Sequence, residues 1–111
     1  MAPQRPYTTV LFDLDGTLVD NFGAIYRAYA YALERMGLPP ASFEKVKATV
    51  GGSVPVTMER LVSKAHAPLA VEHFSAHFPQ VMFEELHALP GVEWLLARLH
   101  NRGLRLAVFT N

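Results

Sequence analysis

Hydrophobic positions along the chain follow two different periods. Residues 9–12 and 104–109 are short, continuous, β-prone runs, and the first is typical of a strand buried on both faces in a parallel sheet. Most of the chain between them repeats its apolar residues at helical spacing. The pattern therefore predicts an α/β protein whose second strand lies parallel to the first after a right-handed crossover.

The first helical segment follows Asp20 or Asn21 as a possible cap and stops at the Gly-Leu-Pro-Pro sequence of residues 37–40. Its apolar stripe is expected to form core rather than a ligand-stacking surface. The stripe consists of Phe22, Ile25, Tyr26, Tyr29, Leu33 and Met36.

Further helices are predicted over residues 43–49 after Ser42 and over residues 54–65 with Ser53 as the cap. A longer helix is expected over residues 68–86, where Pro79 should kink or divide it. The last helix covers residues 92–101 and ends at Gly103 in a left-handed conformation.

Composition excludes several classes of function. Ten basic and ten acidic residues cancel, which gives no support to nucleic-acid or membrane-surface binding. The absence of cysteine excludes disulfides and thiol catalysis. No uncharged run is long enough to cross a membrane, and residues 1–6 do not resemble a secretory leader, so a cytoplasmic location is the default expectation.

Candidate chemistry is concentrated directly after the first strand. Asp13 and Asp15 lie two residues apart, so both carboxylates can face one site, and Gly16 permits a sharp turn. Two close carboxylates need a compensating cation or a shared proton, and oxygen ligands suit Mg²⁺. A simple Asx-type turn is an alternative. A calcium loop is disfavoured because its twelfth position, counted from Asp13, is Ala24.

A second possible metal site involves His73 and His77, which lie one helical turn apart. No glutamate stands next to them in the zinc-protease pattern. We expect them to be solvent-facing or packing residues.

Three stretches resemble the haloacid dehalogenase superfamily, in its phosphoglycolate-phosphatase-like branch with a helical cap. Residues 13–20 read Asp-Leu-Asp-Gly-Thr-Leu-Val-Asp, similar to the first motif of that family. Residues 89–103 resemble the helix before the second motif, and residues 106–111 resemble the strand that ends in the second motif's hydroxyl residue. The resemblance implies a Rossmann-like core from residues 1–17 and 90–111 and an inserted α-helical cap from residues 18–89.

The resemblance also implies roles for individual residues. Asp13 would be the nucleophile that becomes an aspartyl-phosphate, and Asp15 would be the acid and base. Mg²⁺ would be held by the Asp13 carboxylate and the Asp15 main-chain carbonyl. Thr110 and the main chain of Asn111 would bind phosphoryl oxygens, although Thr110 could be a plain strand-end residue.

A glycine-containing loop is the candidate for substrate selection. Gly51 and Gly52 break the pattern between two predicted helices and allow close approach to a ligand. The resemblance implies that this loop faces the catalytic carboxylates, whereas a plain connector between helices is the alternative. A cap of this kind should exclude water and choose the substrate.

One departure from the family concerns the end of the chain. The family's lysine and acidic-pair motifs have no counterpart before Asn111, and Lys45, Lys47 and Lys64 are expected on helix surfaces. We expect this to be the first half of an enzyme that hydrolyses a small phosphorylated metabolite. A β-phosphoglucomutase-like phosphotransferase and a non-catalytic fragment remain alternatives, and a dehalogenase is disfavoured by Asp15. The exact substrate and the oligomeric state are left open.

Overall fold

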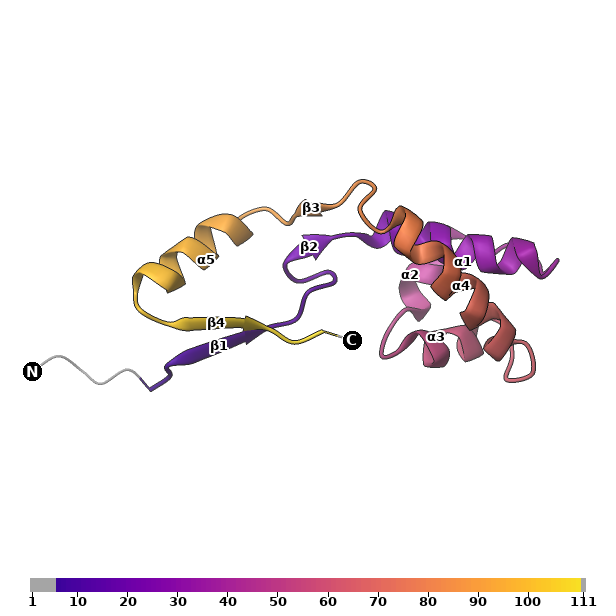
Figure 1. Cartoon of the computed structure of the whole chain (residues 1–111), viewed down its shortest axis with the longest axis horizontal. Coiled ribbons are helices and arrows are strands. Elements are labelled where there is room, and N and C mark those ends of the chain that lie inside the picture. Colours follow the sequence, from indigo (N-terminus) through magenta and orange to yellow (C-terminus); the bar gives the residue numbers. More distant parts are fainter. Residues whose placement is uncertain (1–5, 111) are drawn as a thin grey trace, which may run out of the picture. The chain divides into compact units, whose positions relative to one another are not determined.

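The computed structural model describes residues 6–110, which divide into two compact units (Figure 1). The first unit contains the described residues up to Asp20 together with residues 87–110, and the second contains Asn21–Leu86. Among the residues described, no helix combines the length and the apolar character needed to cross a bilayer.

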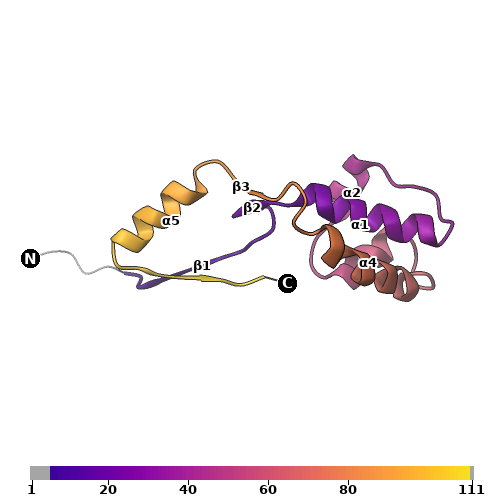
Figure 2. The same cartoon turned by 45° about the horizontal axis from the view of Figure 1, so that its top comes forward.

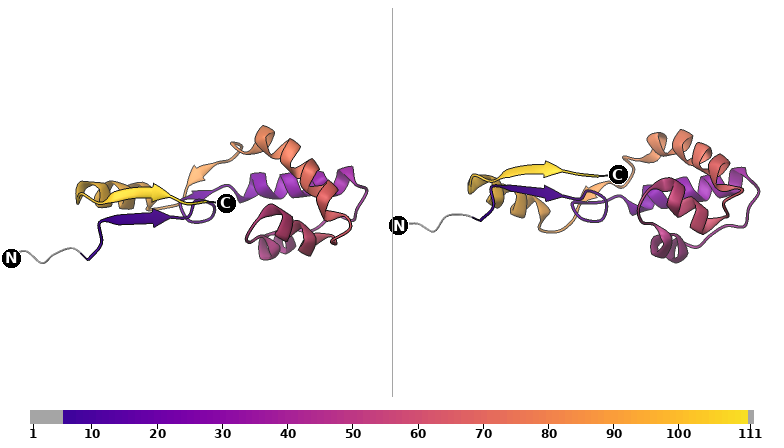
Figure 3. Two further views of the ribbon diagram at one scale, coloured as in Figure 1. Left: turned by 60° about the horizontal axis from the view of Figure 1, so that its bottom comes forward. Right: turned by 90° about the horizontal axis from the view of Figure 1, so that it is seen from below.

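A parallel pair of strands is the centre of the first unit. β1 (Thr9–Phe12) pairs with β4 (Arg105–Val108), and the two arrows run side by side in the same direction (Figure 3). α5 (Val92–Asn101) precedes β4 and ends before Gly103, whose φ of 80° is left-handed. The predicted parallel pairing and the predicted end of this helix are therefore confirmed, although β4 is shorter than the apolar run 104–109.

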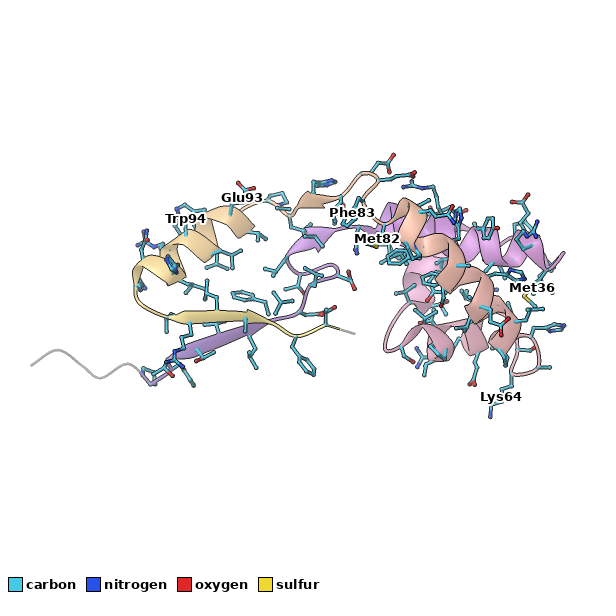
Figure 4. All side chains as sticks on the ribbon, in the orientation of Figure 1. Met36, Lys64, Met82, Phe83, Glu93 and Trp94 are labelled. Carbon is cyan, nitrogen blue, oxygen red and sulfur yellow. The ribbon has the colours of Figure 1, made fainter. Side chains whose placement is uncertain are left out.

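Only one face of this two-stranded sheet is covered in the described residues. α5 packs against β4, and the half-buried Val10 and Phe12 alternate along β1 with exposed residues. Leu11 is 68% exposed, so the prediction that this strand is buried on both faces is wrong for this chain. Trp94 projects from α5 away from the strands and is 65% exposed (Figure 4).

A second, very short ladder was not predicted. β2 (Val19–Asp20) pairs antiparallel with β3 (His87–Ala88). Strands of two residues carry no periodic hydrophobic signal, which explains why the sequence pattern missed them. Leu18, just before β2, is buried, and its carbonyl accepts a hydrogen bond from the Leu89 amide.

The second unit is built from four helices. They are α1 (Phe22–Arg35), α2 (Phe43–Thr49), α3 (Val54–Leu61) and α4 (Ala67–Val81). α1 packs mainly along α4, as Figure 2 shows. The predicted role of the aromatic stripe as core is confirmed, because Tyr29 and Leu33 are 2% exposed and the Tyr29 ring lies 4.6 Å from that of Phe74.

Side-chain caps begin two of these helices, and the cap at Ser53 is the predicted one. The Ser42 hydroxyl accepts a hydrogen bond from the Lys45 amide, and the Ser53 hydroxyl accepts one from the Val56 amide. At α1 the cap is Asn21, without a side-chain hydrogen bond to the helix.

Two helix ends differ from the prediction. α3 ends at Leu61 instead of residue 65, because the Ser63 hydroxyl accepts from the His66 amide and forms a separate turn. α4 ends at Val81 instead of residue 86, and Pro79 lies in its last turn without dividing it. Glu85 follows with a φ of 55°, which is incompatible with a continuing helix.

Candidate functional site

Two paired strands deliver the predicted reactive residues to one edge of the sheet. Phe12 is the partner of Val108, and the Phe109 amide donates to the Phe12 carbonyl over 2.8 Å. Asp13 follows β1 and Thr110 follows β4, so both lie at the carboxyl ends of the two parallel strands. Ligands bind at this end of the strands in α/β sheets. Both residues are exposed. The predicted phosphate-binding residue Asn111 lies outside the described residues.

A tight turn orients the segment that carries both carboxylates. Gly16 has a φ of 76°, and its amide donates to the Val19 carbonyl over 2.9 Å. The Leu14 carbonyl accepts from the amide of Leu18 over 2.9 Å. The turn then enters β2, which β3 anchors, so a segment far along the sequence fixes the loop after Asp13.

The carboxylates differ in their local contacts. An oxygen of Asp13 accepts a hydrogen bond from the Leu14 amide over 2.9 Å, and Asp15 forms an isolated bridge with Val19 through its backbone. Asp20, the next acid along the chain, pairs with His87 at 3.6 Å on the β2–β3 ladder. The exposed Asp13 and Asp15 side chains are therefore the acids of this loop that can meet a ligand beyond β1.

The donor set of this loop fits Mg²⁺. The exposed Asp13 and Asp15 offer carboxylate oxygens, and Mg²⁺ commonly binds one or two carboxylates while keeping waters and substrate phosphates. Within residues 6–110 there is no cluster of three or more histidine or acidic side chains that could hold a metal ion. A metal at this loop would accordingly need ligands in addition to these two side chains.

The predicted substrate-selecting glycines lie in the second unit, between α2 and α3. Gly52 has a φ of 70°, a conformation that favours glycine. The Gly51 amide donates to the Thr57 hydroxyl over 3.2 Å, and the same hydroxyl donates to the Gly51 carbonyl over 3.1 Å. The loop is therefore a defined structure tied to α3.

Comparison with known proteins assigns the family. The family model described as haloacid dehalogenase-like hydrolase matches residues 10–111. The chain belongs to this family. The Cupriavidus necator plasmid protein named phosphoglycolate phosphatase is 38% identical over 96% of this chain and 48% of its own length. Hexitol phosphatase A of Escherichia coli is 38% identical over 91% of this chain and 47% of its own length.

Solved structures of the haloacid dehalogenase-like family share the fold. A crystal structure described as a predicted phosphoglycolate phosphatase from Haemophilus somnus superposes with a TM-score of 0.87 and 25% identity, over 98% of this chain and 53% of that one. The α/β, Rossmann-like fold class predicted from the sequence is thus confirmed. The chain spans about half the length of the relatives it matches.

The structure places His77, one of the two histidines considered as metal ligands, in a packing contact. The His77 ring stacks on the Tyr31 ring at a centroid distance of 3.9 Å and an interplanar angle of 10°. His73 is half-buried on the same helix. These observations agree with the expectation of packing histidines.

Sequence reasoning missed two residues near the glycine loop. Thr57 is 1% exposed, and Arg60 extends from α3 toward Gly51. A side-chain carbon at Gly51 would lie 3.9 Å from the Nη1 atom of Arg60. The polar Thr57 stands beside Met58 on an otherwise apolar helix face, and this interruption of the pattern was the available signal.

Proposed function

We propose that the protein containing this chain is a Mg²⁺-dependent phosphatase that hydrolyses a small phosphomonoester through an aspartyl-phosphate. The observation that carries this proposal is the register of β1 and β4, which brings Asp13 and Thr110 out of the same sheet edge with Asp15 two residues further on. Relatives named as phosphatases support it.

In the proposed mechanism, a carboxylate oxygen of Asp13 attacks phosphorus. The bond between phosphorus and the leaving oxygen breaks, and Asp15 donates its proton to that oxygen. Asp15, now a carboxylate, takes a proton from water as the water attacks phosphorus. Asp13 and inorganic phosphate are then released. The assignment of nucleophile and acid–base roles rests on the family motif at residues 13–20.

The phosphoryl group spreads negative charge over its oxygens, so the site must supply positive charge and hydrogen-bond donors. The Thr110 hydroxyl and the Asn111 main chain are the proposed donors. Mg²⁺ would be held by the Asp13 carboxylate and the Asp15 main-chain carbonyl, and when bound it would supply positive charge that offsets the charge of the phosphoryl group.

The second unit is proposed to act as the cap, with Gly51 and Gly52 in its substrate-selecting loop. A side-chain carbon at the left-handed Gly52 would meet no other heavy atom within 4 Å. The backbone at Gly52 is therefore open to a ligand. Loops of this kind carry binding residues on a rigid scaffold. In this role the unit would exclude water during the reaction.

The position and charge of Arg60 support a substrate with a negatively charged group in addition to the phosphate. Its exposed guanidinium lies beside Gly51, and arginine matches a carboxylate or phosphate through paired hydrogen bonds. Phosphoglycolate carries a carboxylate next to its phosphate, whereas a hexitol phosphate carries hydroxyl groups there. A phosphorylated carboxylic acid is therefore the preferred substrate class. The cytoplasm is the proposed location.

The decisive experiment uses the longest protein that the gene encodes. The purified protein is assayed with phosphoglycolate, a hexitol phosphate and β-glucose 1-phosphate, with and without Mg²⁺, and the reaction is quenched in acid to trap phosphoenzyme. We expect release of phosphate that depends on Mg²⁺, and a trapped phosphoryl group on Asp13. Isomerisation of the sugar phosphate without release of phosphate would instead establish the mutase alternative. Turnover without a trapped phosphoryl group on Asp13 would refute the mechanism.

A further inference from the structure

Thr57 is the one buried polar residue in the described interior of the second unit. It lies on α3 beside Met58, and both side chains are 1% exposed or less. A hydroxyl in such surroundings costs free energy unless it is hydrogen-bonded. Where its hydrogen bonds go is therefore informative.

The Thr57 hydroxyl directs its hydrogen bonds to one residue of the loop. It accepts from the Gly51 amide over 3.2 Å and donates to the Gly51 carbonyl over 3.1 Å. The single donor position of the hydroxyl and one of its two acceptor positions are therefore used by Gly51.

These hydrogen bonds restrain the backbone between the end of α2 and the cap of α3. α2 ends as the Val50 amide donates to the Val46 carbonyl, and α3 begins at the Ser53 cap. Between Val50 and Ser53 stand only two glycines, the residues with the greatest backbone freedom. The amide and the carbonyl of Gly51 belong to the two peptide groups on either side of it, so one hydroxyl fixes the orientation of both.

We propose that Thr57 is a positioning residue, whose hydroxyl holds the Gly51 backbone in the conformation in which the loop selects substrates. This inference rests on the proposed function for its second half, the selection of substrates. Its first half, the restraint of the loop, concerns the second unit alone. The alternative is that Thr57 is a satisfied core residue whose loss lowers stability without changing the loop.

The test uses the longest protein that the gene encodes and three substitutions. Thr57→Val keeps the shape of the side chain and removes the hydroxyl, and Thr57→Ser keeps the hydroxyl. Thr49→Val is the matched control, because the Thr49 hydroxyl donates over 2.7 Å to the Lys45 carbonyl inside α2 and touches no loop residue in any hydrogen bond described.

Two readouts separate positioning from stability. Amide hydrogen exchange at Gly51 is measured by NMR under native conditions, and kcat/KM is measured for phosphoglycolate and for a hexitol phosphate. We expect Thr57→Val to raise exchange at Gly51 about fivefold or more, as loss of one hydrogen bond implies, and to change the kcat/KM ratio. Thr57→Ser should restore both, and Thr49→Val should change neither.

A second variant protects the test against misfolding. Thr57→Ala also removes the hydroxyl, so exchange at Gly51 should rise as it does in Thr57→Val. Unchanged exchange in both variants would overturn the proposal, as would faster exchange with an unchanged kcat/KM ratio. If the wild-type protein hydrolyses no phosphomonoester, the proposed function is wrong, and exchange at Gly51 still decides whether Thr57 holds the loop.

Discussion

Phe12 and Val108 are partners in the parallel ladder between β1 and β4, and the Phe109 amide continues that ladder by donating to Phe12 over 2.8 Å. The two strands are therefore aligned up to the residue at which each ends. Because of this register, Asp13 and Thr110, far apart in the sequence, emerge at the same edge of the sheet.

If Asp13 is the nucleophile, Asp13→Asn should abolish turnover. We expect kcat to fall by at least ~10³-fold, the order seen when a covalent or charge-stabilising group is removed. Steady-state assays of the longest protein from the gene, with Mg²⁺ and the best substrate found, would measure this. Near-normal activity in the variant would exclude the aspartyl-phosphate mechanism.

Asp20→Asn is the matched control for this substitution. Asp20 is the third acid of the same motif, but its carboxylate pairs with His87 at 3.6 Å on the β2–β3 ladder. An ion pair between two partly exposed side chains contributes little to stability, so we expect less than about a tenfold change in kcat. A loss as large as that of Asp13→Asn would mean that negative charge anywhere in the loop, rather than a nucleophile, is required.

Local signals in the sequence were sufficient for the parts of the fold that local chemistry decides. The helix after Ser42 was predicted, Ser53 caps its helix as predicted, and Gly103 ends α5 in the left-handed conformation. Each of these features depends on hydrogen bonds or backbone angles within a few residues. The positions of Asp13 and Thr110 followed in the same way from the ends of two apolar runs.

Apart from the parallel pairing of β1 with β4, features that depend on distant contacts could not be predicted. Val19 pairs with Ala88, and all four helices of the second unit lie between them in the sequence. A strand of two residues is too short to show a hydrophobic period. Leu11 is apolar like its neighbours, yet its exposure depends on which other elements cover the sheet. Thr57 acquires its importance from its hydrogen bonds with Gly51, which lies outside α3. The roles of the predicted site residues remain predictions.

Substitution at Gly52 tests whether the loop selects substrates. Gly52→Val adds no steric clash but forces a β-branched side chain into a φ of 70°, so the loop should change conformation. We expect a change of several-fold in the ratio of kcat/KM values among small phosphomonoesters. Gly52→Asn, which tolerates this φ, should change the ratio less.

Binding of a small phosphoryl mimic is the internal control for Gly52→Val. Beryllium fluoride needs only Asp13 and its surroundings, so its binding should be retained in the variant. An unchanged substrate ranking would favour a plain connector. Loss of beryllium fluoride binding together with loss of folding would show that Gly52 serves structure.

Arg60→Gln should distinguish a substrate carboxylate from a polyol. The substitution removes the charge beside Gly51 and keeps a long polar side chain. Because hydrogen bonds to charged groups contribute about 1.5–3 kcal/mol, kcat/KM for phosphoglycolate should fall about tenfold or more, and that for a hexitol phosphate should change little. Arg35→Gln, at the last turn of α1, is a suitable control. Equal losses for both substrates would remove the argument for a carboxylate.

The 111-residue chain, expressed alone, should be inactive and should self-associate. It lacks the lysine and acidic pair of the family, and one face of its parallel strands leaves Leu11 68% exposed. We expect no Mg²⁺-dependent turnover of an aryl phosphate above an Asp13→Asn control. Sedimentation should show oligomers that Leu11→Ser reduces. Activity of this chain would show that the missing motifs are dispensable.

Tyr29 should make the four-helix unit sensitive to alkali. Burial raises the pKa of its hydroxyl above the usual value, and the hydrogen bond with Thr57 only partly opposes the rise. The unfolded chain therefore loses this proton at about pH 10, while the folded chain keeps it to higher pH. The contribution of Tyr29 to stability is complete below about pH 10 and is lost as the pH rises from there toward the folded-state pKa.

Urea unfolding of wild type and Tyr29→Phe between pH 8 and pH 11 measures this contribution. Below about pH 10 the difference in the free energy of unfolding between wild type and variant should be constant. Above about pH 10 the wild type should lose stability relative to Tyr29→Phe, since phenylalanine has no proton to lose. Tyr7→Phe is the control substitution, because Tyr7 is 73% exposed. Parallel curves for wild type and Tyr29→Phe across the whole range would show that Tyr29 does not ionise differently in the folded and unfolded chains.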